Sequence, residues 1–163
     1  MKRVIMGAAC IALSFGLCDQ GVAAGSVWDK IQESYQGPLD IKVYHSPTCG
    51  CCKDWLAHLK KHGFKVTSIE TEDVEGIKRQ HHLPPAVASC HTAFIEGYMI
   101  EGHVPADDIK RLLKQRPNVR GLAVPGMPSG APGMEDGDKK DPFVVVSFDK
   151  EGNYQPFRQY WAY

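Results

Sequence analysis

The sequence predicts a mixed α/β domain that is followed by a Gly- and Pro-rich segment and a β-hairpin. Within residues 39–116, short β-branched runs alternate with stretches of helical periodicity, which favours an α/β fold. The composition then changes. Residues 124–141 hold too many glycines and prolines for regular structure, and residues 143–160 predict a hairpin that turns at Lys150-Glu151-Gly152-Asn153.

Each element of the first part has its own signal. Trp55, Leu56 and Leu59 recur at helical spacing in the helix that ends at Gly63. Pro84-Pro85 must end the later helix at 73–83, because proline cannot continue a helix. The predicted order after an initial helix is strand, helix, strand, helix, strand, strand, helix. The ranges are a helix at 26–35, a strand at 39–45, a helix up to Gly63, a strand at 65–71, a helix at 73–83, two strands around Glu96-Gly97 within 90–104, and a helix at 105–116.

Residues 1–24 have the features of a cleaved export signal. Lys2 and Arg3 precede an apolar run that is too short for a comfortable membrane span, and small residues up to Ala24 predict cleavage after it. We expect an exported monomer that is not inserted in the membrane after cleavage. Its predicted parts are a core domain at 25–116 and a C-terminal extension at 117–163 that packs on the functional site.

The charge balance excludes two classes of partner. The chain carries 19 Lys and Arg residues against 19 Asp and Glu residues, and loss of the export signal leaves this balance close to neutral. A protein without a basic field has little electrostatic attraction for nucleic acid or for an anionic membrane. We expect neither as a partner.

The cysteines carry the clearest chemical signal. Four of the six lie outside the export signal, at Cys49, Cys51, Cys52 and Cys90. Cys49 and Cys52 have Cys-x-x-Cys spacing where the first strand meets a helix, and the positive end of the helix dipole stabilises thiolates there. This spacing serves redox enzymes and metal sites alike. Together with the order of the elements it resembles the thioredoxin fold, which is the fold that we expect.

Two departures from a disulfide-exchange site favour a metal. Cys51 adds a third sulfur, which would remain a free thiol beside an oxidised pair. Thioredoxin-like proteins also place a cis-proline loop against the redox pair, but residues 88–92 contain no proline and bring Cys90 and His91 there instead. Disulfide exchange does not need this convergence of sulfur and imidazole, whereas metal binding does.

The ligand types point to copper. Thiolate, imidazole and thioether ligands select Cu(I), zinc or iron–sulfur. Zinc takes four ligands in a closed tetrahedron, and adjacent Cys51 and Cys52 cannot easily both reach such an ion with Cys49. Crowded thiolates more naturally bridge several Cu(I) ions. Met127 and Met134, on the Gly/Pro-rich segment, are expected to bind or cover the cluster; the alternative is gap-filling over the sheet.

The histidines divide into two sets. His45 ends the first strand and His103 precedes the last helix, so either is a possible further ligand or a support for the ligands. His58 and His62 stand at i and i+4 on one helix, a spacing that could hold a metal. They lie beside lysines and away from the thiols, so we expect both on the surface.

Three segments together closely resemble the CopG-type copper-resistance proteins of Gram-negative bacteria: "YHSPTCGCCKDW", "LPPAVASCHTAFIEGYMIEGHVPADDI" and "GLAVPGMPSGAPGME". The resemblance spans residues 38–150. It implies an exported, periplasmic, thioredoxin-like domain with a C-terminal extension and a copper cluster that cysteine sulfurs bridge. The matching residues are Cys49, Cys51 and Cys52 in the signature motif, Cys90-His91, and the segment from Met127 to Met134.

The resemblance implies an oxidoreductase that interconverts Cu(I) and Cu(II) and supports periplasmic detoxification and export by an efflux system. A second hypothesis is a copper chaperone or store, which would use the same ligands without redox chemistry. A third is a thiol–disulfide oxidoreductase that uses Cys49 and Cys52. In that case Cys51, Cys90 and the methionines would be dispensable, and the native protein would contain no metal.

Overall fold

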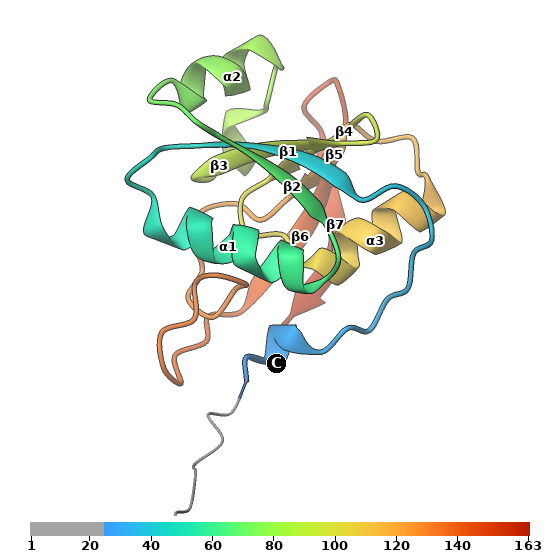
Figure 1. Ribbon diagram of the computed structural model, residues 1–163. Helices are drawn as coiled ribbons and strands as arrows, with labels where there is room; N and C mark the ends of the chain where they lie inside the picture. Colours follow the sequence, from blue (N-terminus) through green and yellow to red (C-terminus); the bar gives the residue numbers. More distant parts are fainter. Residues whose placement is uncertain (1–24) are drawn as a thin grey trace, which may run out of the picture.

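The structure is a computed structural model that describes residues 25–163. The predicted export signal lies outside the described residues. The described chain contains three α-helices and seven strands (Figure 1). Their bounds are β1 Asp40–His45, α1 Gly50–Lys61, β2 Lys65–Glu70, α2 Val74–Gln80, β3 His91–Ile95, β4 Tyr98–Glu101, α3 Ala106–Gln115, β5 Gly121–Ala123, β6 Phe143–Phe148 and β7 Tyr154–Tyr160, with short 3-10 turns η1 at Val27–Asp29 and η2 at Pro85–Val87.

All seven strands form one mixed sheet in the order β2-β1-β3-β4-β5-β6-β7. β1 pairs parallel with β2 and antiparallel with β3, which places His45 opposite His91. The predicted hairpin is confirmed: β3 and β4 are joined by Glu96 and Gly97, which have φ angles of 46° and 86°. This left-handed conformation fits a tight two-residue turn. The α/β class is therefore confirmed.

The C-terminal extension continues the sheet of the core domain. β5 pairs parallel with β4, and β6 and β7 follow as an antiparallel hairpin. The hairpin was predicted, whereas the three-residue strand β5 was not, because so short a run has no readable periodicity. Residues 124–141 form an irregular loop with one isolated bridge, Asp136–Lys139, as their glycines and prolines predict.

The predicted helix at 26–35 is wrong beyond its first turn. Only Val27–Asp29 is helical, and the chain then runs without regular structure to β1. Asp107 of α3 explains the difference, because its carboxylate accepts the backbone N–H groups of Gln32 at 2.9 Å and Glu33 at 3.2 Å. A side chain from another element thus satisfies donors that a helix would otherwise have paired internally.

The helices pack on both faces of the sheet. Figure 1 shows α1 and α3 on one side of β1–β4 and α2 on the other. The larger core lies under α1 and α3, and its fully buried members include Trp55, Leu59, Ile109 and Leu112. A smaller core lies on the opposite face and includes Val87, Met99 and Phe148. The larger core fixes α1, and with it the cysteine motif, against the sheet.

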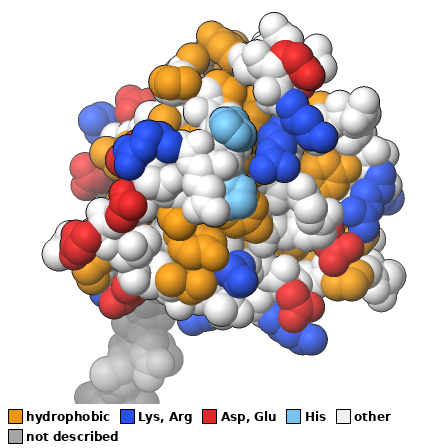
Figure 2. Space-filling model, turned by 90° about the horizontal axis from the view of Figure 1, so that it is seen from above, with side chains coloured by type: hydrophobic (Ala, Val, Ile, Leu, Met, Phe, Trp, Pro, Cys, Tyr) orange, Lys and Arg blue, Asp and Glu red, His pale blue; other side chains and the backbone are white. Residues whose placement is uncertain are grey.

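The surface shows no extended field of one charge on the face that includes α2. Basic and acidic side chains are interspersed there among apolar ones (Figure 2). Within residues 25–163, no helix has the length and the apolar character needed to cross a membrane.

Candidate metal centre

The first strand-to-helix junction delivers three cysteines to one place. Cys49 is the N-cap of α1, and its sulfur accepts the backbone N–H of Cys52 at 3.3 Å. Cys51 lies in the first turn, with its Sγ 3.6 Å from Cys49 Sγ. Free N–H groups and the positive end of the dipole meet at such a helix start, which favours sulfur in its anionic form.

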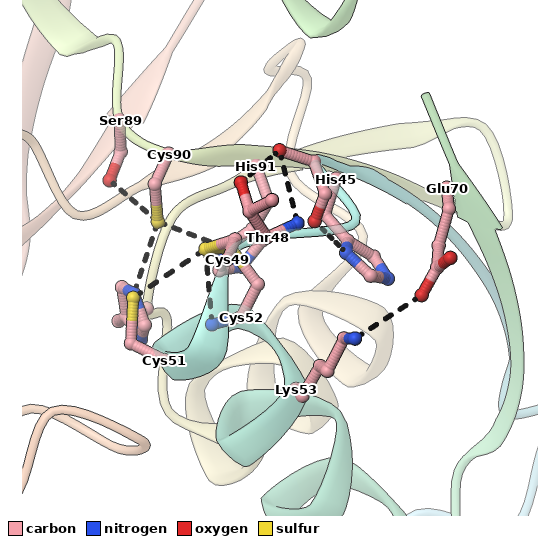
Figure 3. Close-up of a disulfide and its surroundings, with 12 residues drawn as sticks. His45, Thr48, Cys49, Cys51, Cys52, Lys53, Glu70, Ser89, Cys90 and His91 are labelled. Atoms are coloured by element: carbon pink, nitrogen blue, oxygen red, sulfur yellow. Dashed lines mark hydrogen bonds and ion pairs between the residues drawn. A yellow bond between two sulfur atoms is a disulfide. The ribbon is translucent and has the colours of Figure 1, made fainter. Parts of the chain in front are cut away.

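Cys49 and Cys52 are joined by a disulfide, and their Cα atoms lie 5.3 Å apart (Figure 3). Cys51 and Cys90 are free cysteines, and both are half-buried. A disulfide is the oxidised form of the Cys-x-x-Cys pair. Neither of its sulfurs offers a thiolate until the bond is reduced.

Cys90 reaches the same place from another part of the sequence. It directly precedes β3, which pairs with β1, so the start of β3 lies beside the end of β1 where the cysteine motif begins. Ligand atoms of Cys49, Cys51, Cys52 and Cys90 all lie within 4.8 Å of one another. The predicted convergence of Cys90 with the motif is present, and Figure 3 shows Cys90 facing Cys51.

Two buried histidines surround the sulfur of Cys90. His91 Nδ1 and His103 Nε2 each lie 3.2 Å from Cys90 Sγ. The ligand atoms of these three residues also lie within 4.8 Å of one another, so Cys90 belongs both to a four-sulfur group and to a mixed sulfur–imidazole group. Both imidazoles are fully buried.

His103 is held in one tautomer. Its Nδ1 donates to the carbonyl of Pro132 at 2.8 Å, so Nε2 keeps its lone pair when the ring is neutral and directs it at Cys90. Burial lowers the pKa of His103, which favours this neutral form. A backbone carbonyl that fixes the distal nitrogen is the usual support of a histidine metal ligand. Pro132 lies on the C-terminal loop, and its role could not be read from the sequence.

His91 has an unsatisfied nitrogen. Its Nε2 is buried without a hydrogen-bond partner, although the ring packs against Trp55 with the two centroids 4.3 Å apart and the planes tilted by 38°. Burial lowers the pKa of His91 well below its usual range, so the imidazole is neutral. Trp55 thus positions the ring of His91, and its own Nε1 donates to the carbonyl of Val104 at 2.9 Å.

Burial also acts on Cys90. It raises the pKa of the Cys90 thiol to about 12, with the neighbouring Cys51 as a further cause. The group at the centre of the cluster is therefore a neutral thiol in the metal-free protein at neutral pH. Binding of a metal cation favours the thiolate form of Cys90 instead, because a coordinated thiol loses its proton.

The C-terminal loop lies against the cluster, but its two methionines differ. Met127 is 56% exposed, whereas Met134 is partly buried and packs against the larger core. Between them, Gly133 lies against the first turn of α1, beside the carbonyl of Cys51. Pro132 contacts His103, as described above. The loop therefore covers the side of the cluster formed by Cys51 and His103.

His45 lies near the cluster but turns away from it. Its Nδ1 is 2.9 Å from the carbonyl of Ser46, and its Nε2 is 2.7 Å from the hydroxyl of Ser68. Both ring nitrogens are thus engaged, and His45 belongs to neither ligand group. In the sheet it lies opposite His91.

His58 and His62 are buried, so the predicted surface position is wrong. Their exposed fractions are 7% and 3%. His58 Nε2 accepts the backbone N–H of Ala106 at 3.0 Å and so caps the start of α3, while His62 Nε2 donates to the carbonyl of Trp28 at 2.6 Å. Each histidine satisfies a backbone group of a neighbouring segment, and the periodicity of α1 alone could not show which segment would cover it.

The donor atoms fit a soft metal ion. Four cysteine sulfurs and two neutral imidazoles meet in one half-buried place, and thiolate with imidazole is the donor set of copper and zinc sites. The unpartnered nitrogen of His91 and the lone pair of His103 have no better protein partner within the described residues.

Comparison with known proteins identifies relatives of the chain. Residues 87–134 match a family model described as "Protein of unknown function, DUF411". No curated protein sequence matches the chain. Two solved structures named "Copper resistance protein copG", Form 2 and Form 1, are each 45% identical to the chain with a TM-score of 0.72. They cover 76% of this chain, which in turn covers 99% and 98% of theirs.

At 45% identity the match extends over nearly the whole length of both solved structures and over three quarters of this chain. The chain belongs to the CopG family of copper resistance proteins.

Proposed function

We propose that this protein is a periplasmic copper-binding protein of copper resistance that holds several copper ions and interconverts Cu(I) and Cu(II). One observation carries the proposal: four sulfurs from two distant parts of the sequence lie within 4.8 Å of one another, and two neutral imidazoles adjoin one of them. The proposed ligands are Cys49, Cys51, Cys52, Cys90, His91, Met127 and Met134, with His103 as a further ligand and His45 as a support.

The ligand types suit both oxidation levels of copper. Thiolates bind Cu(I) strongly, and sulfurs as crowded as those of Cys51 and Cys52 favour bridging between ions over four-fold coordination of one ion. Imidazoles from His91 and His103 stabilise Cu(II), which thiolates alone tend to reduce. A site that mixes both types therefore limits the loss of metal when the charge of the ion changes.

Loading of the site requires prior reduction. Breaking the Cys49–Cys52 disulfide takes up two electrons and two protons and yields two thiols. The thiols then lose their protons as they bind metal. Each later oxidation of Cu(I) to Cu(II) transfers one electron to an external one-electron acceptor, and each reduction takes one electron from an external donor.

The arrangement of the chain is part of the proposal. Strand–helix–strand order with the cysteines at the first helix start supports a thioredoxin-like domain at 25–116, and the loop beside Cys51 supports a role for the extension at 117–163 in covering the copper. We propose export with cleavage after Ala24, action as a periplasmic monomer and transfer of copper to an efflux system.

The disulfide favours one alternative. A Cys49–Cys52 bond at a helix start is what a thiol–disulfide oxidoreductase would use, with Cys49 as the attacking sulfur. Under that alternative the second sulfur pair, Cys51 and Cys90, would have no function. A copper chaperone or store uses the same ligands as our proposal and differs only in the absence of redox cycling.

Repeated redox cycling of the loaded protein tests the proposal. Reduced protein is loaded with Cu(I), freed of excess metal, oxidised with ferricyanide without oxygen and reduced again with ascorbate. We expect a Cu(II) electron paramagnetic resonance signal that appears and disappears while the copper content stays constant. Release of copper at the first oxidation would favour the chaperone or store. Failure to retain Cu(I) at all would favour disulfide exchange.

A further inference from the structure

A buried ion pair lies behind Cys90, on the face of the sheet that α2 covers. Lys78 of α2 and Glu101 of β4 expose 5% and 0% of their side chains, and Lys78 Nζ is 3.4 Å from Glu101 Oε1. Charged groups are rarely removed from water to this extent unless they are paired and hydrogen-bonded. A pair of apolar side chains would join α2 to the sheet equally well, so the charges need another explanation.

Both members of the pair bind the residue that precedes Cys90. Glu101 Oε1 accepts the backbone N–H of Ser89 at 2.7 Å, and Lys78 Nζ donates to the backbone carbonyl of Ser89. That carbonyl belongs to the peptide bond between Ser89 and Cys90. On the other side of Cys90, Thr92 donates its hydroxyl to Glu101 Oε2 at 2.6 Å. The pair therefore holds the backbone of Ser89 before the cysteine and the side chain of Thr92 after it.

The same segment is tied to the C-terminal loop. The hydroxyl of Ser89 donates to the carbonyl of Gly126 at 2.5 Å, and the N–H of Gly126 donates to the carbonyl of Ala88 at 3.3 Å. Met127 follows directly. The position of Ser89 thus determines the place of Cys90 on one side and of the methionine loop on the other.

We propose that the Lys78–Glu101 pair positions Cys90 for copper binding. It holds residue 89 so that Cys90 Sγ stays among the other sulfurs and beside His91 and His103, and it thereby sets the affinity for Cu(I). The inference rests on the proposed function, because it names the support of one ligand of that site. Lys78 and Glu101 are positioning residues and do not contact the metal.

A double-mutant cycle tests the inference. Cu(I) affinity is measured by competition with bicinchoninate for the reduced wild-type protein, Lys78→Met, Cys90→Ser and the double variant. Loss of support for a metal ligand weakens binding about 10- to 100-fold, and we expect this for Lys78→Met. In the Cys90→Ser background the same substitution should have no further effect, because residues that act through one group are not additive.

The control and the second variant keep the test decisive. Lys53 pairs with Glu70 at 3.4 Å near the cluster, but both side chains are 53% exposed, so Lys53→Met should leave the affinity unchanged (Figure 3). Glu101→Gln keeps the volume and one oxygen acceptor, and it replaces Lys78→Met if the latter does not fold. An equal loss of affinity with and without Cys90, or no loss in either positioning variant, would overturn the inference.

A copper-free readout separates this inference from the proposed function. With the Cys49–Cys52 disulfide intact, Cys51 and Cys90 are the free thiols, and dibromobimane becomes fluorescent only when it bridges two thiols. We expect rapid bridging in the wild type and in Lys53→Met, and slow bridging in Lys78→Met. Slow bridging together with a wild type that binds no Cu(I) would reject the proposed function and keep the positioning role. Unchanged bridging would reject the positioning role.

Discussion

Cys90 and His103 face each other across the candidate metal centre, with His103 Nε2 3.2 Å from Cys90 Sγ although the two residues are 13 positions apart in the sequence. The imidazole cannot turn freely, because its Nδ1 donates to the carbonyl of Pro132. A buried nitrogen lone pair is thus held against a buried sulfur. Three separate segments, the start of β3, the turn before α3 and the C-terminal loop, contribute to this contact.

Replacing His103 should weaken copper binding. His103→Asn removes the nitrogen that faces Cys90, and we expect Cu(I) affinity to fall about 10- to 100-fold. Competition with bicinchoninate measures the change. His82→Asn is the matched control, because His82 is exposed and has a φ of 54°, a conformation that Asn tolerates. Equal affinities of the two variants would show that His103 has no part in binding.

Copper uptake should depend on prior reduction of the protein. Within residues 25–163 the Cys49–Cys52 disulfide leaves only Cys51 and Cys90 as thiols, so the oxidised protein should bind fewer Cu(I) ions than protein treated with a phosphine reductant. Elemental analysis after removal of excess metal gives the copper content per chain of the oxidised and of the reduced protein. A Cys52→Ser variant cannot form the bond, and its uptake should be the same with and without the reductant. An identical copper content of oxidised and reduced wild type would contradict this prediction.

The C-terminal loop should tolerate no side chain at Gly133. Its φ is 79°, and a Cβ there would lie 2.5 Å from the backbone nitrogen of Trp55 and 3.0 Å from the carbonyl oxygen of Cys51. We expect Gly133→Ala to lower the free energy of unfolding by about 3 kcal/mol, from backbone strain and overpacking together. Urea unfolding measures the loss.

Gly137 provides the control for this loop. It also has a positive φ, 55°, but a Cβ would meet no atom within 4 Å. Gly137→Ala should therefore show the conformational strain alone, about 1 kcal/mol. Similar losses in both variants would mean that the contact between the loop and the start of α1 adds nothing to stability.

The stability of the protein should fall in acid through His58. Burial lowers the pKa of His58 to about 3, with His62 as a second cause, and His58 Nε2 needs its lone pair to accept the N–H of Ala106. Below pH 6.5 the unfolded chain binds a proton that the folded protein refuses, so stability is complete above that pH and is lost as the pH falls toward 3. Between pH 7 and pH 5 we expect a loss of about 2 kcal/mol from this group.

His58→Gln tests this pH dependence, because glutamine can still accept the N–H of Ala106 but does not titrate. Its free energy of unfolding should vary less between pH 7 and pH 5 than that of the wild type. Asp108, whose pKa burial raises to about 6, contributes the opposite slope between about pH 4 and 6, but it does so in both proteins and cancels in the difference. Parallel pH profiles of the two proteins would contradict the prediction.

The sequence predicted most elements because their signals are local. Helical spacing of Trp55 and Leu59, the turn at Glu96-Gly97 and the Gly/Pro content of the loop all act within a few residues. The prediction of a helix at 26–35 was wrong because the carboxylate of Asp107, which is distant in the sequence, accepts two of the backbone N–H groups of this segment. β5 was not predicted, because three residues are too few to show the alternation of a strand. They form a strand because they pair with β4 and β6.

The grouping of the candidate ligand residues was predictable from the sequence, but the residues that hold them in place were not. The density of cysteines at 49–52 and the expected position of Cys90 beside them predicted that the four sulfurs lie together, and they do. Pro132, Lys78 and Glu101 act through backbone groups or from buried positions, and such contacts leave no pattern in a single sequence. The burial of His58 and His62 was missed for the same reason, since the covering segments are remote in the chain.

The most direct test of the central claim, that this chain binds copper through a shared cysteine cluster, is the metal content of the purified protein. Protein from copper-supplemented cells is subjected to elemental analysis together with a count of free thiols. We expect several copper ions per chain and their loss when Cys51 alone is changed to serine. No copper, two free thiols and an intact Cys49–Cys52 disulfide would contradict it and establish disulfide exchange as the better account.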